Sequence, residues 1–178
     1  MIEQVAEFHA AFGVEKQKEL TPEFIELRNK LFKEEYDEYL EAVENNDLVE
    51  IADAITDMMY ILVGSWQLVY DGMIPYYTFG VSSYRETQSI ILLIDYKLQE
   101  YNNNLLFTDD LIGAVTELAN HHDIFFCLHE LFHEVHRSNM SKLDASGKPI
   151  YREDGKILKS DLYFVPNLKE ILIKNGRM

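Results

Sequence analysis

Acidic side chains recur at helical spacing between residues 34 and 57, and this pattern limits the possible folds more than any other feature of the sequence. Residues three or four apart lie on one face of a helix, with Cβ atoms about 5–6 Å apart. Two clusters separated by a short break therefore predict two helices, each with a pincer of carboxylate oxygens. The acids at these positions are the ExxE pair Glu35 and Glu38, the ExxD pair Glu50 and Asp53, and Asp57 one turn further on.

Both pincers interrupt helix faces that we expect to be buried. An apolar stripe from Leu20 to Leu31 precedes Glu35 on the same predicted face. A carboxylate on an inward face costs on the order of several kcal/mol unless a positive charge lies beside it. Because Lys and Arg are absent between residues 34 and 84, we expect a bound divalent cation to compensate the acids. Oxygen ligands without nearby Cys or His favour Mg²⁺, with Mn²⁺ as a second candidate, over zinc.

The other acids of this stretch have a simpler interpretation. A run of acidic residues usually marks a solvated helix face, which is what we expect of Glu34, Asp37, Glu41 and Glu44. A solvated face is also the alternative for the two pincers, but it does not explain why they interrupt apolar stripes.

Start and stop signals divide the first part of the chain into helices at residues 2–12, 22–44 and 48–70. Thr21 followed by Pro22 is a strong helix start, and Asp47 caps the next helix. The break between the two acidic helices is so short that they should be antiparallel neighbours, with their pincers facing each other. The sequence therefore predicts an all-α antiparallel helical bundle.

The remaining part of the chain gives weaker signals. Residues 71–124 are interpreted as an insertion, irregular at first and then helical over 83–99, which serves as a lid or an oligomer contact. A long helix is expected from 108 to about 137. The Asp154-Gly155 pair predicts a hairpin within a loop and hairpin tail at residues 137–167, and a short helix closes the chain.

The long helix contains a formal HExxH motif from His129 to His133, with Glu130 in the middle. Zinc peptidases build their metal site on this motif. No GxxH extension follows, and no clear third ligand lies downstream. We therefore expect surface or interface histidines and keep a zinc peptidase as the least favoured alternative.

Charge is distributed unevenly along the chain. The net charge of −15 disfavours nucleic acid and anionic membranes as partners. Residues 1–136 carry −19, whereas residues 137–178 carry +4. A solvated basic hairpin is one interpretation of this tail; phosphate and nucleoside recognition is the other. The tail residues expected to contact substrate are Asn139, Lys142, Lys156 and Lys159.

Compartment signals point to a cytoplasmic protein. The most hydrophobic stretch, residues 51–70, has spanning length, but Asp53 and Asp57 make burial in a bilayer unfavourable. The N-terminal residues lack the basic and apolar regions of a signal peptide. A lone Cys127 forms no internal disulfide and fits a reducing environment.

The order of these acids, followed by Asp57-x-x-Tyr60, resembles the MazG-like all-α nucleoside triphosphate pyrophosphohydrolases, which include phosphoribosyl-ATP pyrophosphohydrolase and the dimeric dUTPases. The stretch His136 to Lys142, reading HRSNMSK, is similar to the tail of that group, as is the GKxxK loop from Gly155 to Lys159. The resemblance implies one domain over residues 1–178. It also implies that Glu35, Glu38, Glu50 and Asp53 hold Mg²⁺, with Asp57 as a further ligand or orienting group.

The resemblance implies a hydrolase that cleaves a nucleoside triphosphate between its α and β phosphates, in nucleotide-pool housekeeping. Glu34 would then act as general base or help to bind a further ion, beside the catalytic acids Glu35 and Glu38. A homodimer or a dimer of dimers is expected. The alternative is a metal-dependent nucleotide sensor without turnover. The base and sugar of the substrate are not specified by the sequence.

Overall fold

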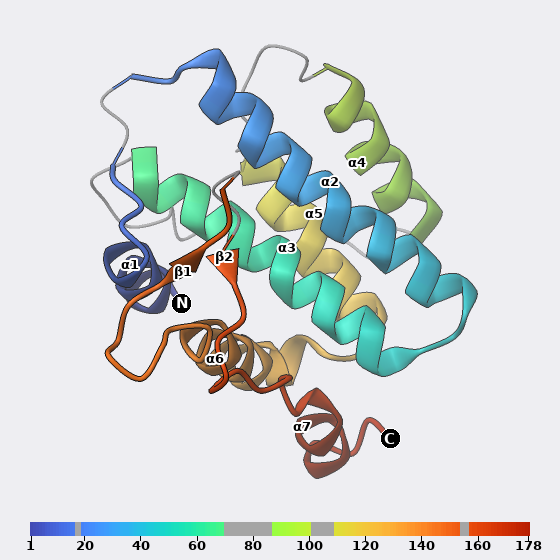
Figure 1. The fold of residues 1–178 in the computed structure, drawn as a ribbon. Coiled ribbons are helices and arrows are strands. Elements are labelled where there is room, and N and C mark those ends of the chain that lie inside the picture. The colour runs from blue at the N-terminus through green and yellow to red at the C-terminus, as the bar shows by residue number, and fades with distance from the viewer. Residues whose placement is uncertain (17–18, 70–86, 101–108, 154–156) are drawn as a thin grey trace.

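The computed structural model describes residues 1–16, 19–69, 87–100, 109–153 and 157–178. Helices account for the described elements apart from one short antiparallel hairpin, which confirms the all-α prediction (Figure 1). In chain order the elements are α1 (Ile2–Ala11), α2 (Pro22–Glu44), α3 (Leu48–Val69), α4 (Thr87–Glu100), α5 (Asp109–His121), the 3₁₀ turn η2 (Phe125–Cys127), α6 (Leu128–Met140), β1 (Ile150–Tyr151), β2 (Ile157–Leu158) and α7 (Leu168–Lys174).

Helices α2 and α3 form the predicted antiparallel pair, and they make the most extensive contact between any two described elements. The Thr21 hydroxyl accepts a hydrogen bond from Phe24 N at 3.2 Å, so the first turn of α2 is capped as expected. Asp47 caps α3 in the same way, accepting from Val49 N at 3.0 Å. Asn46 completes the tight connection in the left-handed region, with φ at 54°.

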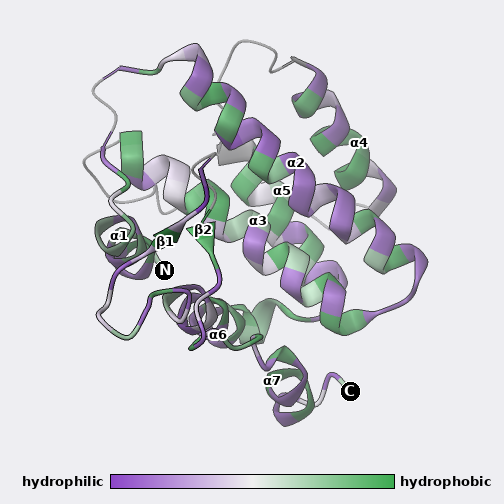
Figure 2. Cartoon of the chain, in the orientation of Figure 1, coloured by the Kyte–Doolittle hydropathy of each residue, from purple (hydrophilic) through white to green (hydrophobic). Residues whose placement is uncertain are grey.

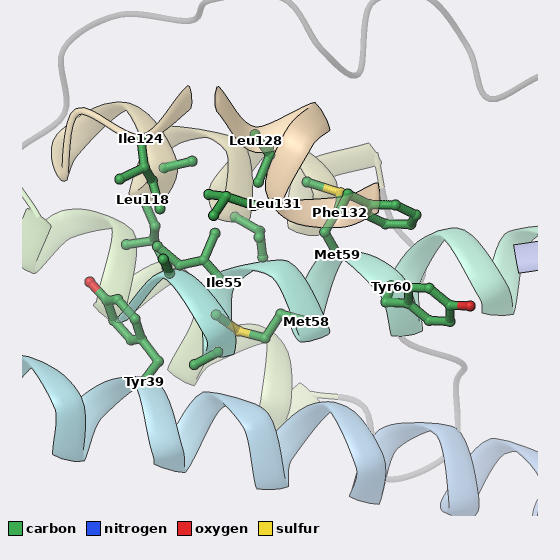
Figure 3. Close-up of a cluster of buried hydrophobic side chains, with 14 of the residues drawn as sticks. Tyr39, Ile55, Met58, Met59, Tyr60, Leu118, Ile124, Leu128, Leu131 and Phe132 are labelled. Atoms are coloured by element: carbon green, nitrogen blue, oxygen red, sulfur yellow. The ribbon is translucent and has the colours of Figure 1, made fainter. Parts of the chain in front are cut away.

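Helix α3 is the central element of the molecule. Helices α1, α2, α5, α6 and α7 all contact it, so it is apolar almost all round. The core therefore lies along the length of α3, which packs against α2 on one side and against α5 and α6 on the other (Figure 3). Side chains that meet there include Tyr39 from α2, Ile55, Met58, Met59 and Tyr60 from α3, Leu118 from α5, and Leu128, Leu131 and Phe132 from α6.

The predicted inner stripe of α2 is wrong. Leu20 and Leu27 are 45% and 53% exposed, and the outward side of α2 is largely hydrophilic (Figure 2). Large aromatic side chains bury more apolar area than leucine at the same spacing, so the helix turns its aromatic edge toward α3. The buried residues of α2 are Phe32, Tyr36, Tyr39 and Ala42.

The long helix expected over residues 108–137 is in fact two helices. Helix α5 ends at His121, and Asp123 adopts φ of 60° before the η2 turn leads into α6. Asp tolerates this left-handed conformation better than most residues, which explains the break. The break lets α5 and α6 pack separately against α3.

The described part of residues 71–124 contributes to the core. On α5, Leu111, Ile112, Val115 and Leu118 are fully buried, and α4 packs against α5. Helix α5 thus covers a face of α3 that a bare helical pair would expose, and α4 packs on α5 in turn. Residues 71–86 and 101–108 of this segment lie outside the described residues.

The tail folds back over the helices as a hairpin. Strands β1 and β2 are antiparallel, with Ile150 opposite Leu158. The predicted turn at Asp154-Gly155, and with it Lys156, lies outside the described residues. The Tyr151 hydroxyl donates to the carbonyl of Phe12, which ties the hairpin to the end of α1. Among the described helices, none is long and apolar enough to cross a membrane.

Candidate metal and phosphate site

The acids of α2 and α3 face one another across the helical pair. The pKa of Glu35 is raised to about 7, mainly by burial and also by the neighbouring charges of Glu38 and Asp53. Burial likewise raises the pKa of Asp53 to about 6, with contributions from Glu50 and Glu38. These mutual effects cross from one helix to the other, so the two predicted pincers form one cluster.

Asp57 extends this cluster by one turn. Burial raises its pKa well above the ordinary value, and the charges of Asp53 and Glu35 act in the same direction. Its side chain therefore belongs with the four predicted ligands in space as well as in sequence. Asp57 is the acid that is held most firmly away from water in this group.

The acids line the edge of the core and do not lie on its fully buried face, which corrects the expectation from the sequence. Glu35, Asp53 and Asp57 are half-buried, whereas Glu38 and Glu50 are exposed. The reason is that α2 turns its aromatic residues toward α3 in place of the leucines, and Glu35 and Glu38 lie beside those aromatic residues. The cluster thus has a dry inner side and a rim that is open to water.

Lys142 supplies the positive charge that the local sequence lacks. It follows α6 and lies among the acids, because the charges of Asp57 and Glu35 raise its pKa while burial, the larger effect, lowers it. Its Nζ donates to Asn139 Oδ1 at 2.7 Å. The structure therefore brings two of the predicted substrate residues to the cluster. This long-range contact supplies a positive charge that the local sequence lacks, and the bound dication stays a prediction.

Lys159 lies near the same place. Its Nζ is 4.2 Å from the centre of the Tyr163 ring, and the charges of Lys159 and Tyr163 both affect the pKa of Lys142. A cation held on an aromatic ring keeps its remaining donors available. Two of the three predicted lysines thus meet beside the acids.

Glu34 is on the solvent side of the cluster. Its carboxylate is 3.9 Å from Lys30 on the same exposed helix face, yet its charge still contributes to the raised pKa of Glu35. Of the candidate catalytic residues, Glu34 and Glu38 are therefore exposed to water, whereas Glu35 is half-buried.

Serine hydroxyls hold the basic tail in place, a role that the sequence analysis did not assign. Ser138 Oγ donates to Phe164 O at 2.7 Å, and the Ser141 hydroxyl accepts from Phe164 N at 3.1 Å. Ser160 Oγ reaches Ser141 O at 3.0 Å. The HRSNMSK stretch contains the first two serines, so its spacing was the available signal.

A chain of polar side chains next to Asp57 was also missed. The Tyr60 hydroxyl is 3.0 Å from His136 Nδ1, and His136 Nε2 is 3.2 Å from Glu7 Oε2. Tyr60 lies one turn after Asp57, whose charge contributes to raising the Tyr60 pKa after burial, the larger cause. The signal was the buried position of His136, which periodicity on α6 places toward α3.

The HExxH motif lies on the exposed face of α6. His129 and His133 are exposed, and Glu130 Oε2 accepts a hydrogen bond from Lys174 Nζ at 2.7 Å. The motif therefore joins α6 to α7, and its glutamate is engaged in an ion pair. These contacts favour the expected surface histidines over a peptidase site.

The donor chemistry of the acid cluster fits a hard dication. Among the described residues no three His, Cys, Asp or Glu side chains are already gathered closely enough to hold a metal ion. Carboxylates without a cation repel one another, and the exposed Glu38 and Glu50 have the freedom to turn inward. Oxygen-only ligands with raised pKa values are those that gain most from Mg²⁺ or Mn²⁺.

Comparison with known proteins covers the part of the chain that carries the acids. An uncharacterised protein of Acanthamoeba polyphaga mimivirus is 28% identical over 237 aligned positions, which cover 94% of this chain and 94% of the relative. No solved structure is significantly similar to the chain. The family model of phosphoribosyl-ATP pyrophosphohydrolase matches residues 5–71, which include α2, α3 and all the clustered acids. Over residues 5–71 the chain is thus similar to phosphoribosyl-ATP pyrophosphohydrolases, in keeping with the resemblance of its acidic motif to the MazG-like group.

Proposed function

We propose that this protein hydrolyses a nucleoside triphosphate between its α and β phosphates, with Mg²⁺ or Mn²⁺, and releases a monophosphate and pyrophosphate. The family match implies a hydrolase that acts on phosphoanhydride bonds of nucleotides. The observation that carries the finer proposal is that the charge of Asp53 raises the pKa of Glu35, and that both raise the pKa of Asp57, with Lys142 among them. Nucleotide-pool housekeeping is the proposed role.

The acid cluster would hold the metal. Glu35, Glu38, Glu50 and Asp53 are the proposed ligands, with Asp57 as a further ligand or an orienting group. Bound there, Mg²⁺ would screen the phosphate charge and make the attacking water more acidic. Burial of the inner acids keeps competing water away from this side of the site.

The chain's own residues perform the remaining steps. Glu34 is exposed beside Glu35 and is the proposed general base that takes the proton of the attacking water. Lys142 and Lys159 donate to phosphate oxygens and stabilise the departing pyrophosphate. Asn139 holds the Lys142 ammonium at 2.7 Å and so fixes its direction.

A pyrophosphate-release assay with a panel of nucleoside triphosphates and Mg²⁺ tests this proposal. Glu38→Gln should reduce turnover by at least about a hundredfold, because it removes a ligand charge and leaves the exposed side chain's shape unchanged. Glu41→Gln is the matched control, an exposed acid further along α2. Unchanged kinetics in Glu38→Gln would refute the assignment. Nucleotide binding without any pyrophosphate release would favour the sensor.

We further propose that two copies of the chain associate through α2 and α4. These helices are adjacent, since the Tyr36 hydroxyl donates to Asp95 Oδ1 at 3.1 Å. Leu27, Leu92 and Tyr96 on them are more than half exposed, at 53%, 58% and 53%. Light scattering after size exclusion should give twice the monomer mass, and Leu92→Glu should return the monomer.

A further inference from the structure

Arg28 is a cation without a carboxylate partner in the described part of the chain. It projects from α2 toward α3, where its Nε donates to Ser65 Oγ at 2.8 Å and its Nη2 donates to Ile61 O at 2.7 Å. No ion pair among the described residues includes it. Burial lowers its pKa to about 10, and no neighbouring acid offsets that effect.

The guanidinium has donors to spare. Arginine carries five N–H groups and accepts no hydrogen bond, and the two acceptors above engage only part of this set. None of its nitrogens is among the fully buried, unpartnered polar atoms of the described residues, and the side chain as a whole is half-buried. The remaining N–H groups are therefore not fully enclosed by the described residues, although burial is the main influence on the side chain.

The missing side chain of Gly64 leaves space for the guanidinium of Arg28. Gly64 faces the guanidinium, and a Cβ there would lie 3.1 Å from Arg28 Nη2 and 3.3 Å from His9 Nε2. His9 Nδ1 is 2.6 Å from Gln67 Oε1, and the pKa of His9 is lowered by burial and, more weakly, by the charge of Arg28. A neutral polar lining thus surrounds one fixed positive charge.

This polar group lies on the same seam as the acid cluster. Arg28 precedes Glu35 by seven residues on α2, and Gly64 follows Asp57 by seven residues on α3. Seven helical residues span about 10 Å, and nearly two complete turns keep them on one face. A nucleotide whose phosphates lie at the acids can place its ribose and base over this distance.

On the basis of the function proposed above, we propose that Arg28 selects the base of the substrate by donating to an exocyclic oxygen. Guanine offers O6 and N7 as adjacent acceptors, and the pyrimidines offer carbonyl oxygens. Adenine carries an amino donor where guanine has O6. A guanidinium cannot accept from that donor, so adenine nucleotides leave a desolvated cation without its acceptor. Arg28 is thus a specificity-determining residue that favours oxo-bearing bases.

Kinetics with dGTP, dUTP and dATP test this inference in the wild type, Arg28→Met and Arg28→Lys. The wild type should prefer dGTP and dUTP over dATP by about ten- to a hundredfold in kcat/KM, the range of one well-placed bidentate contact. Arg28→Met should lose this preference, mainly through a higher KM for dGTP and dUTP. Arg28→Lys should keep part of it. Lys33→Met, an exposed cation on the same helix, is the control.

Binding without turnover separates this inference from the proposed function. Calorimetry should show tighter binding of dGMP than of dAMP in the wild type, and equal binding in Arg28→Met. If no nucleotide releases pyrophosphate, the proposed function fails, while the calorimetric preference still decides the role of Arg28. Equal use of dATP by the wild type, or a preference that survives Arg28→Met, overturns the inference. If Arg28→Met fails to fold, Gly64→Ala crowds Nη2 and should weaken the same preference.

Discussion

Lys142 gives the sharpest prediction at the scale of single residues, because it lies among the carboxylates and faces the proposed phosphate site. Its positive charge lowers the pKa of Asp57, Asp53 and Glu35. Lys142→Met should lower kcat/KM by about a hundredfold through the lost phosphate contact. It should also move the acid limb of the pH–rate profile to higher pH, because the acids then ionise less readily.

Two companion variants separate charge from shape at this position. Lys142→Arg retains the charge and should recover part of the activity and the original pH limb. Lys148→Met, an exposed residue of the same tail, should change neither. A pH profile of Lys142→Met that coincides with the wild type would show that the lysine does not act on the cluster.

Residues within one helical pair could be identified from the sequence, and residues joined by long-range packing could not. The five acids lie on two consecutive helices, so their spacing alone placed them together. Lys142 was selected for phosphate contact, but its position beside Asp57, 85 residues earlier, depends on how α6 packs against α3. The same limit hid the contact between Tyr60 and His136. Arg28 was missed because periodicity does not reveal an absent partner.

At the scale of elements, two substitutions on α2 test which face of this helix is buried. Phe32 is fully buried, whereas Leu27 is 53% exposed. Phe32→Ala should lower the free energy of unfolding by about 3–5 kcal/mol, because it leaves a cavity between α2 and the core. Leu27→Ala should change it by no more than about 0.5 kcal/mol in the monomer. Denaturant melts measured in parallel check both values.

The result has one clear contrary outcome. Similar losses in the two variants would mean that α2 buries the leucine stripe after all.

The sequence did predict the existence, ends and direction of α2 and α3, because Thr21 and Asp47 are local caps. The rotation of α2 could not be predicted in this way, since aromatic and leucine residues form competing stripes and α3 decides between them. The break at Asp123 is similar, because a single left-handed residue leaves the apolar period on each side intact.

At the scale of the whole molecule, two groups of titrations oppose each other. Glu35 and Asp53 have pKa values raised to about 7 and about 6, so the folded state binds more protons than the unfolded state between about pH 4 and 7. Their effect makes the metal-free protein less stable as pH rises through that window. Burial lowers the pKa of His122 to about 4, so this residue alone makes the protein less stable as pH falls from about 6.5 to 4.

The acids with raised pKa values should outweigh His122 in their effect on stability, because the pKa of Asp57 shifts in the same direction. The net charge of −15 also adds repulsion as pH rises. In EDTA, the free energy of unfolding should therefore decrease by about 1–2 kcal/mol from pH 5.5 to pH 8, after allowance for solvent screening. Glu35→Gln should remove part of this decrease. His122→Gln should make the rise in the free energy of unfolding toward acid pH steeper, because it removes the opposing titration.

Mg²⁺ should restore stability at pH 8 in the wild type and do so less in Glu35→Gln, because a bound dication favours the ionised carboxylates. Thermal melts at the two pH values check each expectation, and a metal-free protein that is more stable at pH 8 than at pH 5.5 would contradict the close approach of these acids.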